Sequence, residues 1–308
     1  MVVVDGVQFA DLARGDLRVI LERGHVGAAY GFVPHTSDVG YDWVCFTTDY
    51  GRADGFPAVC EGVIARTAPH ARVLHVSHEV PRQDVRSGAD LLVRSVPYLP
   101  RAVHLAVVDP GVGTGRRPVA IVSPEGVLIG PDNGLLPSAA EVLGGAIAAY
   151  EIAEFHLAPV SATFHGRDIF APAAAHVANG VNPSALGPAV DLDSLIRLPE
   201  PVTHTEPGRV TTEVLGADRF GNVQLAAKDL AADPGTVVHA QVGDRSLEAV
   251  VGRTFADARS GDAVVLLDSA GRVAIAVNGG SAAEILLPRP GDRAVLLLAA
   301  APAPPARS

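Results

Sequence analysis

Two glycine-rich segments of the chain bring together residue types that can activate a water molecule. The first runs from Val108 to Arg117 (VDPGVGTGRR) and follows an apolar run that starts at Ala102, so a carboxylate and two guanidiniums lie in a turn after a buried strand. The second runs from Thr163 to Asp168 (TFHGRD). A carboxylate, an imidazole and a guanidinium suffice to hold a water and remove its proton. Open α/β sheets place their ligands at such strand ends.

Each segment also has a purely structural interpretation. Asp-Pro-Gly is a common turn sequence whose glycines supply positive φ. A single histidine near a helix start is often a cap or a satisfied polar residue. Further polar clusters along the chain favour the catalytic interpretation. These clusters are Asp49 with Asp54, Pro131 to Gly134, Asp218 to Asn222, Asp268 with Ser269, and Asn278 to Ser281.

The cluster at Asp49 points to a sugar. Asp49 ends the first expected strand, where an acidic side chain suits a bidentate grip on ribose hydroxyls. Asp54 stands at the start of the next helix, and a role as its N-cap is at least as well supported as a role in binding. Each of the other clusters is also typical of a turn.

The composition favours a folded protein that acts on a small molecule. The 308 residues are 48% hydrophobic and 19% charged, enough for two domains with a sizeable core. A formal net charge of −10 argues against nucleic acid or an anionic membrane as the main partner. We find neither a signal peptide nor an apolar run of about 18 residues, so we expect a cytoplasmic location. Cys45 and Cys60 lack metal-ligand spacing and indicate buried thiols in a reducing compartment.

Strand and helix patterns alternate from Asp42 onward. This alternation predicts an α/β domain with a mainly parallel sheet and right-handed crossovers. The expected strands are 43–47, 72–76, 103–108, a hairpin of 118–123 with 127–129, and 146–152; the expected helices are 56–67, 84–96 and 167–178.

A second pattern begins after a proline-marked stretch at 199–207. Short strands with glycine and aspartate turns predict a smaller all-β, barrel-like domain. Its expected strands are 209–215, 236–242, 246–251, 263–267, 272–277 and 294–298. We divide the chain into an N-terminal extension with a short helix near Phe9 to Glu22 (1–41), an α/β catalytic domain (42–203), a β domain (204–299) and a flexible tail (300–308).

Seven motifs in order resemble a known enzyme family. They are FTTDYG, SHEVPRQDVRSGA, VVDPGVGTGRR, GPDNGLL, TFHGRDIFAPAAA, DRFGN and VNGGSAAE. With them the chain resembles the S-adenosyl-L-methionine hydroxide adenosyltransferases, relatives of the bacterial fluorinases and chlorinases, over about Asp42 to Leu298. Seven ordered motifs are far more specific than one glycine-rich fingerprint.

The resemblance implies an activity and an assembly. The activity is hydrolysis of S-adenosyl-L-methionine to adenosine and L-methionine, by attack of a water-derived hydroxide on C5′ of the ribose, with no metal or other cofactor. The assembly is a homotrimer in which each substrate lies between the α/β domain of one subunit and the β domain of the next.

Residue roles follow from the same resemblance. Asp109, Arg116 and His165 fall on the family's triad, and Phe164 and Gly166 line the reaction centre. The implied contacts to the rest of the substrate are Asp49, with Asp54 nearby, for the ribose diol; Asp218 and Ser269 for the methionine ammonium and carboxylate; and Asn222, with the backbone near Asn278 and Gly279, for the adenine. Phe220 is expected as a further substrate-binding residue.

Two departures indicate which branch of the family this is. Halogenating relatives carry Tyr in place of Asp109 and Tyr-Ser in place of His165-Gly166, so the halide-binding hydroxyls are missing and water is the expected nucleophile. Ala270 stands where the fluorinase has an Arg near the methionine carboxylate, so the residues that bind this carboxylate are less defined.

The residue types suit this reaction, and they leave alternatives open. When the C–S bond breaks, the sulfonium leaves as a neutral thioether, so no general acid is needed. Water, in contrast, must be positioned and deprotonated, by either Asp109 or His165. A chlorinase-like halogenase and a non-catalytic S-adenosylmethionine or adenosine sensor are alternatives. A metal-dependent phosphoesterase would use Asp49, Asp54, His78, Asp109 and His165 as hard ligands, but these lack HxxxD or DxD spacing.

Overall fold

The computed structural model describes residues 2–4, 7–9 and 40–299. The first two of these stretches form an antiparallel hairpin of β1 (Val2–Val4) and β2 (Val7–Phe9), within a separate unit from Met1 to Ser37. Phe9 therefore ends a strand, and the rest of the helix expected near Phe9 to Glu22 lies outside the described residues. The expected tail at 300–308 lies outside them as well.

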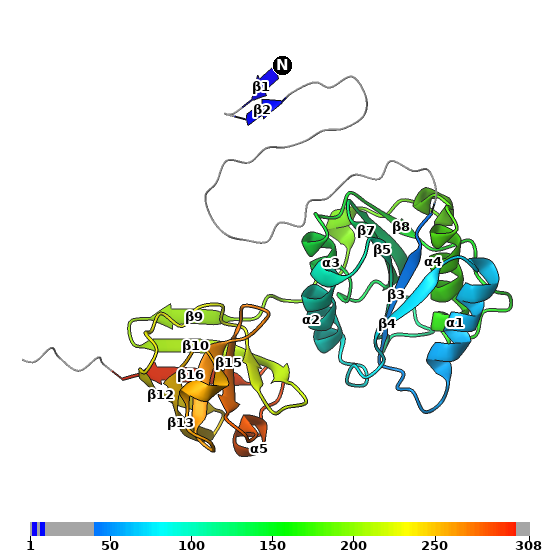
Figure 1. The fold of residues 1–308 in the computed structure, drawn as a ribbon. Helices are drawn as coiled ribbons and strands as arrows, with labels where there is room; N and C mark the ends of the chain where they lie inside the picture. Colours follow the sequence, from blue (N-terminus) through cyan, green and yellow to red (C-terminus); the bar gives the residue numbers. More distant parts are fainter. Residues whose placement is uncertain (1, 5–6, 10–39, 300–308) are drawn as a thin grey trace, which may run out of the picture. The chain divides into compact units, whose positions relative to one another are not determined.

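A six-stranded, mainly parallel sheet forms the α/β domain (Figure 1), which confirms the predicted fold class. Its order is β4-β3-β5-β7-β6-β8; the first four strands run parallel, and β6 is antiparallel to both of its neighbours. The strands are β3 (Trp43–Thr48), β4 (Arg72–Ser77), β5 (Ala102–Val107), β6 (Pro118–Ser123), β7 (Gly126–Pro131) and β8 (Ala148–Glu151).

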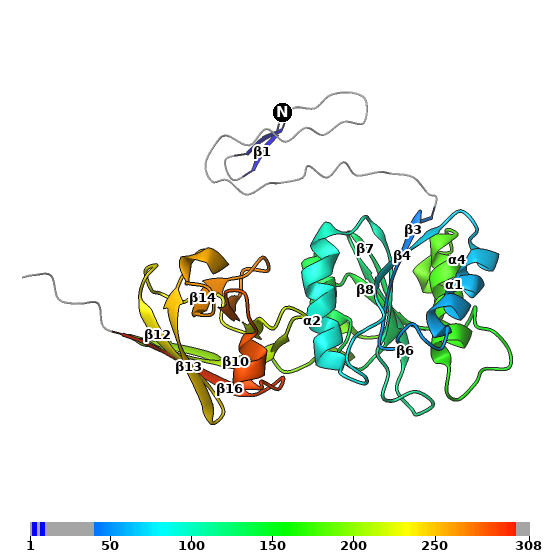
Figure 2. The same cartoon turned by 60° about the horizontal axis from the view of Figure 1, so that its bottom comes forward.

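Helices cover both faces of this sheet (Figure 2). On one face α1 (Phe56–Thr67) and α4 (Ala171–Ala178) pack on β3 and β5 through one buried cluster. On the other face α2 (Val85–Ser95) and α3 (Pro137–Val142) share a second cluster with β5, β6 and β7. Burial on both faces explains why β5 is apolar throughout, the pattern of a central parallel strand.

Two of these helices begin differently from what the sequence indicates. The expected helix 84–96 starts one residue later, because Asp84 is its N-cap and accepts the Ser87 backbone N–H at 2.9 Å. The expected helix 167–178 begins as a π-helical turn, η2 (Gly166–Phe170), and continues as α4. The short helix α3 was not predicted, since six residues do not establish a helical period.

Short 3₁₀ turns occur in the connections of both domains. They are η1 (Val96–Tyr98), η3 (Pro183–Leu186), η4 (Leu192–Ser194) and η5 (Phe255–Asp257).

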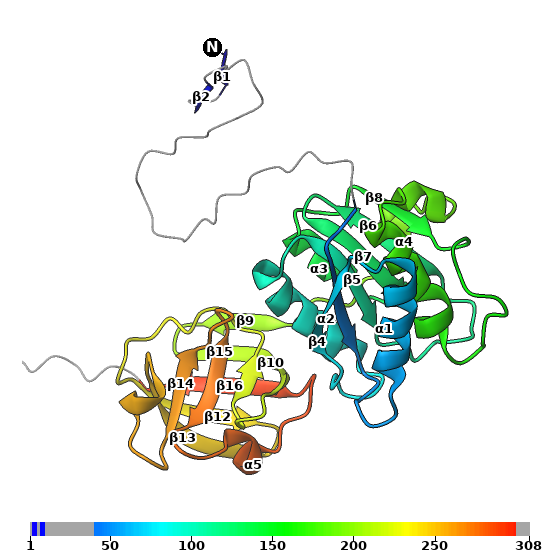
Figure 3. The ribbon, with the colours of Figure 1, turned by 45° about the vertical axis from the view of Figure 1, so that its right-hand side comes forward.

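A closed barrel of seven strands forms the β domain (Figure 3). The pairing runs β11-β15-β14-β13-β12-β16-β10, β10 also pairs with β11 to close the circle, and β9 adds to β10 from outside. The strands are β9 (Thr203–Glu206), β10 (Arg209–Ala217), β11 (Val223–Leu225), β12 (Val237–Val242), β13 (Arg245–Val251), β14 (Ala263–Leu267), β15 (Val273–Val277) and β16 (Arg293–Leu298). The predicted barrel is confirmed, although β9, β11 and the helix α5 (Ala282–Leu286) are too short to have been predicted.

Both cysteines are buried in the α/β domain, as the sequence indicates. Cys45 lies in β3 and Cys60 in α1, each as a free thiol. Burial raises the pKa of both thiols to about 12, so they are unreactive at neutral pH. Within the described residues, no helix has the length and apolar character needed to cross a bilayer.

Candidate active site

The carboxyl ends of three parallel strands meet at one cavity. Because β4, β3 and β5 are adjacent and parallel, the segments that follow them reach the same edge of the sheet. A cavity of about 730 Å³ lies there. Its lining includes Asp49, Tyr50, Asp54 and Phe56 after β3, His78 and Gln83 after β4, Asp109 after β5, and Phe164 before η2.

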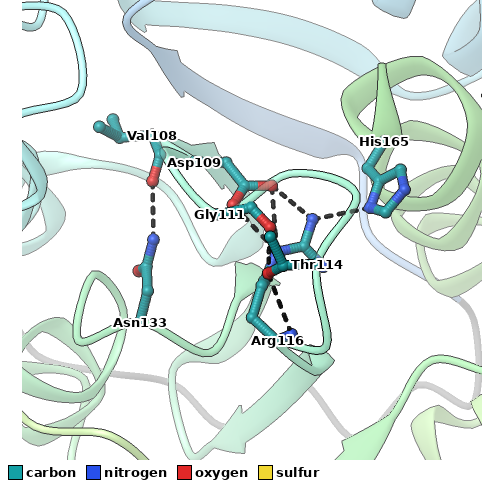
Figure 4. A network of polar contacts seen from close by, with 7 residues as sticks. All are labelled: Val108, Asp109, Gly111, Thr114, Arg116, Asn133 and His165. Carbon is teal, nitrogen blue, oxygen red and sulfur yellow. Dashed lines mark hydrogen bonds and ion pairs between the residues drawn. The ribbon is translucent and has the colours of Figure 1, made fainter. Parts of the chain in front are cut away.

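The proposed triad is assembled beside this cavity (Figure 4). Arg116 Nε donates to Asp109 Oδ1 at 2.9 Å and to Oδ2 at 3.1 Å, and its Nη2 bonds to Oδ2 as well. The same Nη2 donates to His165 Nδ1 at 2.8 Å. The Arg116 guanidinium therefore bridges the carboxylate and the imidazole, and its charge is further stabilised over the Phe170 ring, 5.1 Å from the centroid.

Backbone contacts bring the two glycine-rich segments together. Gly113 has φ of 76° and lies so close to the carbonyl oxygen of Ala162 that a Cβ would collide with it. Asn133 of the PDNG turn donates its side-chain amide to the carbonyl oxygen of Val108 at 2.9 Å (Figure 4). The PDNG turn thus has a structural role: it holds the backbone from which Asp109 projects.

The contact with Arg116 defines the tautomer of His165. A guanidinium N–H can only donate, so His165 Nδ1 must accept, and the single proton of the neutral ring lies on Nε2. Burial, followed by the Arg116 charge, lowers the pKa of His165 from its ordinary value, while Asp109 and Asp168 act in the opposite direction. The imidazole is therefore neutral at neutral pH.

The acidic pair at the end of β3 lies in the cavity. Asp49 Oδ2 accepts the backbone N–H of Gln83 at 2.8 Å, which ties the end of β3 to the segment after β4. The N-cap of α1 is Gly55, and no side chain caps that helix. The alternative role of Asp54 as a helix cap is therefore wrong, and Asp54 lines the cavity with Asp49.

Three aromatic rings form the wall beside the triad. Tyr50, Phe56 and Phe164 meet edge to face, with centroids 5.1 to 6.0 Å apart. Phe164 was expected at the reaction centre, whereas Tyr50, Phe56 and Gln83 were not singled out. Their signal was positional, because each lies between the end of β3 or β4 and the first residue of the helix that follows it.

The predicted substrate residues of the β domain form two separate groups. Asp218 Oδ1 accepts the backbone N–H groups of Phe220 and Asn222 at 2.9 and 3.0 Å, and its Oδ2 accepts the Asn222 amide at 2.8 Å. This turn contacts the loop after β15: a Cβ on Gly221 would collide with Ser281. The turn of Asp218 to Asn222 therefore lies against the loop that Asn278 and Gly279 begin.

Ser269 lies at the opposite end of β15. It is exposed in the turn where Asp268 Oδ1 accepts the backbone N–H groups of Ala270 and Arg272 at 2.8 and 2.9 Å. Among residues 40–299, the side-chain hydrogen bonds of Asp218, Asn222 and Asn278 all stay within the β domain. Among the described residues, no hydrogen bond or ion pair joins either group to Asp109, Arg116 or His165.

The described residues offer no cluster of three or more His, Cys, Asp and Glu suited to a metal ion. His78, a ligand in the phosphoesterase alternative, has both ring nitrogens in contacts, Nδ1 with Thr48 Oγ1 at 2.9 Å and Nε2 with His75 Nδ1 at 2.7 Å.

Comparison with known proteins places the chain in a family. The models of the SAM hydroxide adenosyltransferase N-terminal and C-terminal domains match residues 44–187 and 212–295. The (R)-S-adenosyl-L-methionine hydrolase of Salinispora tropica is 53% identical to this chain, over 82% of this chain and 96% of that protein. The protein of the same name from Thermus thermophilus is 44% identical, over 79% of this chain and 94% of that protein.

More distant relatives and a solved structure agree with this placement. A fluorinase of an Actinoplanes species is 28% identical over 76% of this chain and 90% of that protein. An uncharacterized conserved protein from Thermotoga maritima, whose crystal structure is solved, is 35% identical, covers 82% of this chain and 99% of its own, and has a TM-score of 0.76. With both domain models matched in order, the chain belongs to the SAM hydroxide adenosyltransferase family.

Proposed function

We propose that this protein hydrolyses S-adenosyl-L-methionine to adenosine and L-methionine by attack of water on C5′ of the ribose. The observation that carries the proposal is the bridge from Asp109 through Arg116 to His165 beside a cavity that also contains Asp49. Relatives at 44% to 54% identity are named (R)-S-adenosyl-L-methionine hydrolase, whereas the fluorinases are more distant.

The bond that breaks and the bond that forms need different help from the protein. As the C5′–S bond breaks, its electron pair neutralises the sulfonium, so methionine leaves without a general acid and without a metal or other cofactor. The water oxygen forms the new bond to C5′ and must lose one proton. The protein therefore needs one base, held where the oxygen lies in line with the leaving sulfur.

Asp109 is the better candidate for this base. The Nδ1 lone pair of His165 already accepts from Arg116 and its Nε2 carries a proton, so the neutral ring has no free acceptor. Asp109 pairs with Arg116: Oδ2 accepts from both Nε and Nη2, whereas Oδ1 accepts from Nε alone and keeps a lone pair for the water. We assign proton removal to Asp109, positioning to Arg116, and orientation of the guanidinium to His165.

The remaining groups would hold the substrate around this centre. Asp49 uses one oxygen for the Gln83 N–H and keeps the other for the ribose diol, with Asp54 beside it. We assign Asn222, Asn278 and Gly279 to the adenine end and Asp218, in the same turn as Asn222, to the methionine ammonium. Phe220 is a further substrate contact, and Ser269, in the separate turn before β15, is assigned to the methionine carboxylate. We propose, as the family resemblance implies, that these residues come from the neighbouring subunit of a homotrimer.

A product assay tests this function. The purified protein is incubated with separated (R) and (S) sulfonium epimers of S-adenosyl-L-methionine, with and without a chelator, and products are resolved by chromatography. We expect adenosine and methionine, faster from the (R) epimer and unaffected by the chelator. Halogenated 5′-deoxyadenosine on addition of chloride would support the halogenase alternative, loss of turnover with chelator the metal alternative, and tight binding without product the sensor alternative.

A further inference from the structure

The hydroxyl of Tyr50 occupies the place where residue 166 has no side chain. A Cβ built on Gly166 would collide with Tyr50 Oη and lie 3.1 Å from Cζ. Gly166 is in a helical conformation that any residue can adopt, so the glycine is needed for room and not for its backbone angles. The phenol thus reaches the backbone next to His165.

The ring of Tyr50 is held in this position from two sides. Its centroid lies 6.0 Å from that of Phe56 and 5.8 Å from that of Phe164, both edge to face. Tyr50 also follows Asp49 directly, and its backbone N–H donates to Thr48 Oγ1 at 3.2 Å. The hydroxyl therefore has a defined location at the cavity wall.

This hydroxyl is a neutral donor without a protein acceptor. Among the described residues, Tyr50 Oη makes no hydrogen bond, although the residue lines the cavity. Burial, and the nearby Cys60, Asp49 and Asp109, raise the pKa of Tyr50 well above its ordinary value, with Arg116 acting in the opposite direction. The phenol keeps its proton at neutral pH and cannot act as the base.

The triad leaves a need for such a donor. Arg116 Nε and Nη2 are directed at Asp109 and His165, so those two nitrogens do not point at a water. The attacking oxygen develops hydroxide character as Asp109 removes its proton, and a hydrogen-bond donor aimed at it stabilises that charge.

We propose that Tyr50 is a further catalytic residue whose O–H donates to the attacking water, on the side of Gly166 and opposite the Asp109 carboxylate. This inference rests on the proposed function. The water then has one proton directed at Asp109 and receives a hydrogen bond from Tyr50, which leaves a lone pair to face C5′.

The first test removes only the hydroxyl. In Tyr50→Phe, we expect kcat to fall about 10- to 100-fold, with KM for the substrate and Kd for adenosine changed less than about twofold. Tyr98→Phe is the matched control, because that tyrosine is 82% exposed, and its kcat should equal that of the unmodified enzyme. A rise in KM at constant kcat would instead make Tyr50 a binding residue and overturn the proposal.

The second test displaces the hydroxyl without removing it. Gly166→Ala places a methyl group where Tyr50 Oη lies, so kcat should fall in the otherwise unmodified enzyme. In the Tyr50→Phe background the same change meets ring carbons at 3.1 and 3.3 Å, so the ring must shift by a few tenths of an ångström, and the further loss of kcat should be much smaller than in the otherwise unmodified enzyme. A loss of kcat in the double variant that is smaller than the sum of the two single losses distinguishes a shared action on the water from two independent packing defects. If Tyr50→Phe does not fold, Gly166→Ala alone remains informative.

The outcomes separate this inference from the proposed function. Absence of adenosine from the unmodified enzyme would refute the function itself. Normal hydrolysis by the unmodified enzyme together with a Tyr50→Phe rate within twofold of it would overturn only the role of Tyr50. Fully additive losses in the double variant, with lowered thermal stability, would also overturn it.

Discussion

The Arg116 guanidinium determines the chemistry available to its two partners. The side chain of Arg116 is 9% exposed and that of Asp109 is 5% exposed, so the pair is largely withdrawn from water. Removing one partner of such a pair leaves an uncompensated charge, which costs about 3–5 kcal/mol in buried cases. At the scale of single residues, the role of base is therefore tested with Asp109→Asn, which removes the charge but keeps an oxygen that accepts from Arg116, together with a check that the variant folds.

Asp109→Asn should lower kcat about 10²- to 10⁴-fold, the usual contribution of a positioned base, with little change in substrate binding. His165→Asn should cost less, because its amide oxygen can still accept from Arg116 Nη2. Steady-state kinetics on both variants, with circular dichroism to verify folding, decide the matter. A larger loss in His165→Asn than in Asp109→Asn would reverse the two assignments.

His165 also predicts a pH dependence. Its pKa is lowered from the ordinary value of about 6.5 by burial and by Arg116. Protonation turns Nδ1 from an acceptor into a donor and breaks the contact with Arg116, so kcat/KM should be constant from pH 8 to about 6.5 and fall at more acidic pH. In His165→Asn this acid limb should be absent. An unchanged limb in that variant would assign it to another group.

At the scale of elements, the loop after β5 depends on one close backbone approach. Gly113→Ala introduces a Cβ at a φ of 76° and against the carbonyl oxygen of Ala162, so the segments that carry Asp109 and His165 must move apart. We expect a loss of at least tenfold in kcat/KM, since small misplacements of catalytic groups are costly.

Gly115→Ala is the matched control in the same loop. A Cβ there meets nothing within 4 Å, so kcat/KM should be retained. Equal activity of the two variants would show that the approach of Gly113 to Ala162 does not position the triad.

At the scale of the whole molecule, a site shared between subunits can be tested by mixing. Asp109→Ala and Asn222→Ala should each be inactive alone, because each removes one half of the site. Random co-assembly of equal amounts should restore about one quarter of the activity, since that share of interfaces joins two intact halves. A mixture of Asp109→Ala with Arg116→Ala, both in the α/β domain, should restore none. Recovery in both mixtures, or in neither despite proven mixing, would argue against a shared site.

The stability of the α/β domain should depend on pH through His104. This residue of β5 is buried, neither ring nitrogen has a partner among the described residues, and burial lowers the pKa of His104 to about 4. The unfolded chain binds a proton near pH 6.5 and the folded chain near pH 4, so protonation favours unfolding and stability falls as pH drops through this window.

The loss attributable to His104 is about 2 kcal/mol between pH 7 and pH 5. Denaturant unfolding at the two pH values should show a smaller difference for His104→Leu than for the unmodified protein. His239→Leu, which removes an exposed histidine of β12, is the control and should leave the difference unchanged. The same difference in His104→Leu as in the unmodified protein would place the sensitive group elsewhere.

The sequence by itself determined the long elements, the order of the two domains and the two segments that carry Asp109, Arg116 and His165. The helix expected at 56–67 is α1 with the same bounds, and the alternation of strands and helices predicted the parallel sheet. These features are encoded in hydrophobic periods that repeat over several residues. The motifs around Asp109 and His165 are local as well, since each is a few residues of fixed spacing after an apolar run or before a helix.

Only the tertiary structure decided what these residues do to one another. Elements shorter than one or two periods, such as α3, β9 and β11, carry no pattern to detect. The contacts of Arg116 with His165 and of Tyr50 with Gly166 join residues that are far apart in the chain. Such contacts depend on strand order and on the space between side chains. No local pattern records either one, and for that reason the tautomer of His165 and the location of the Tyr50 hydroxyl emerge only in the folded chain.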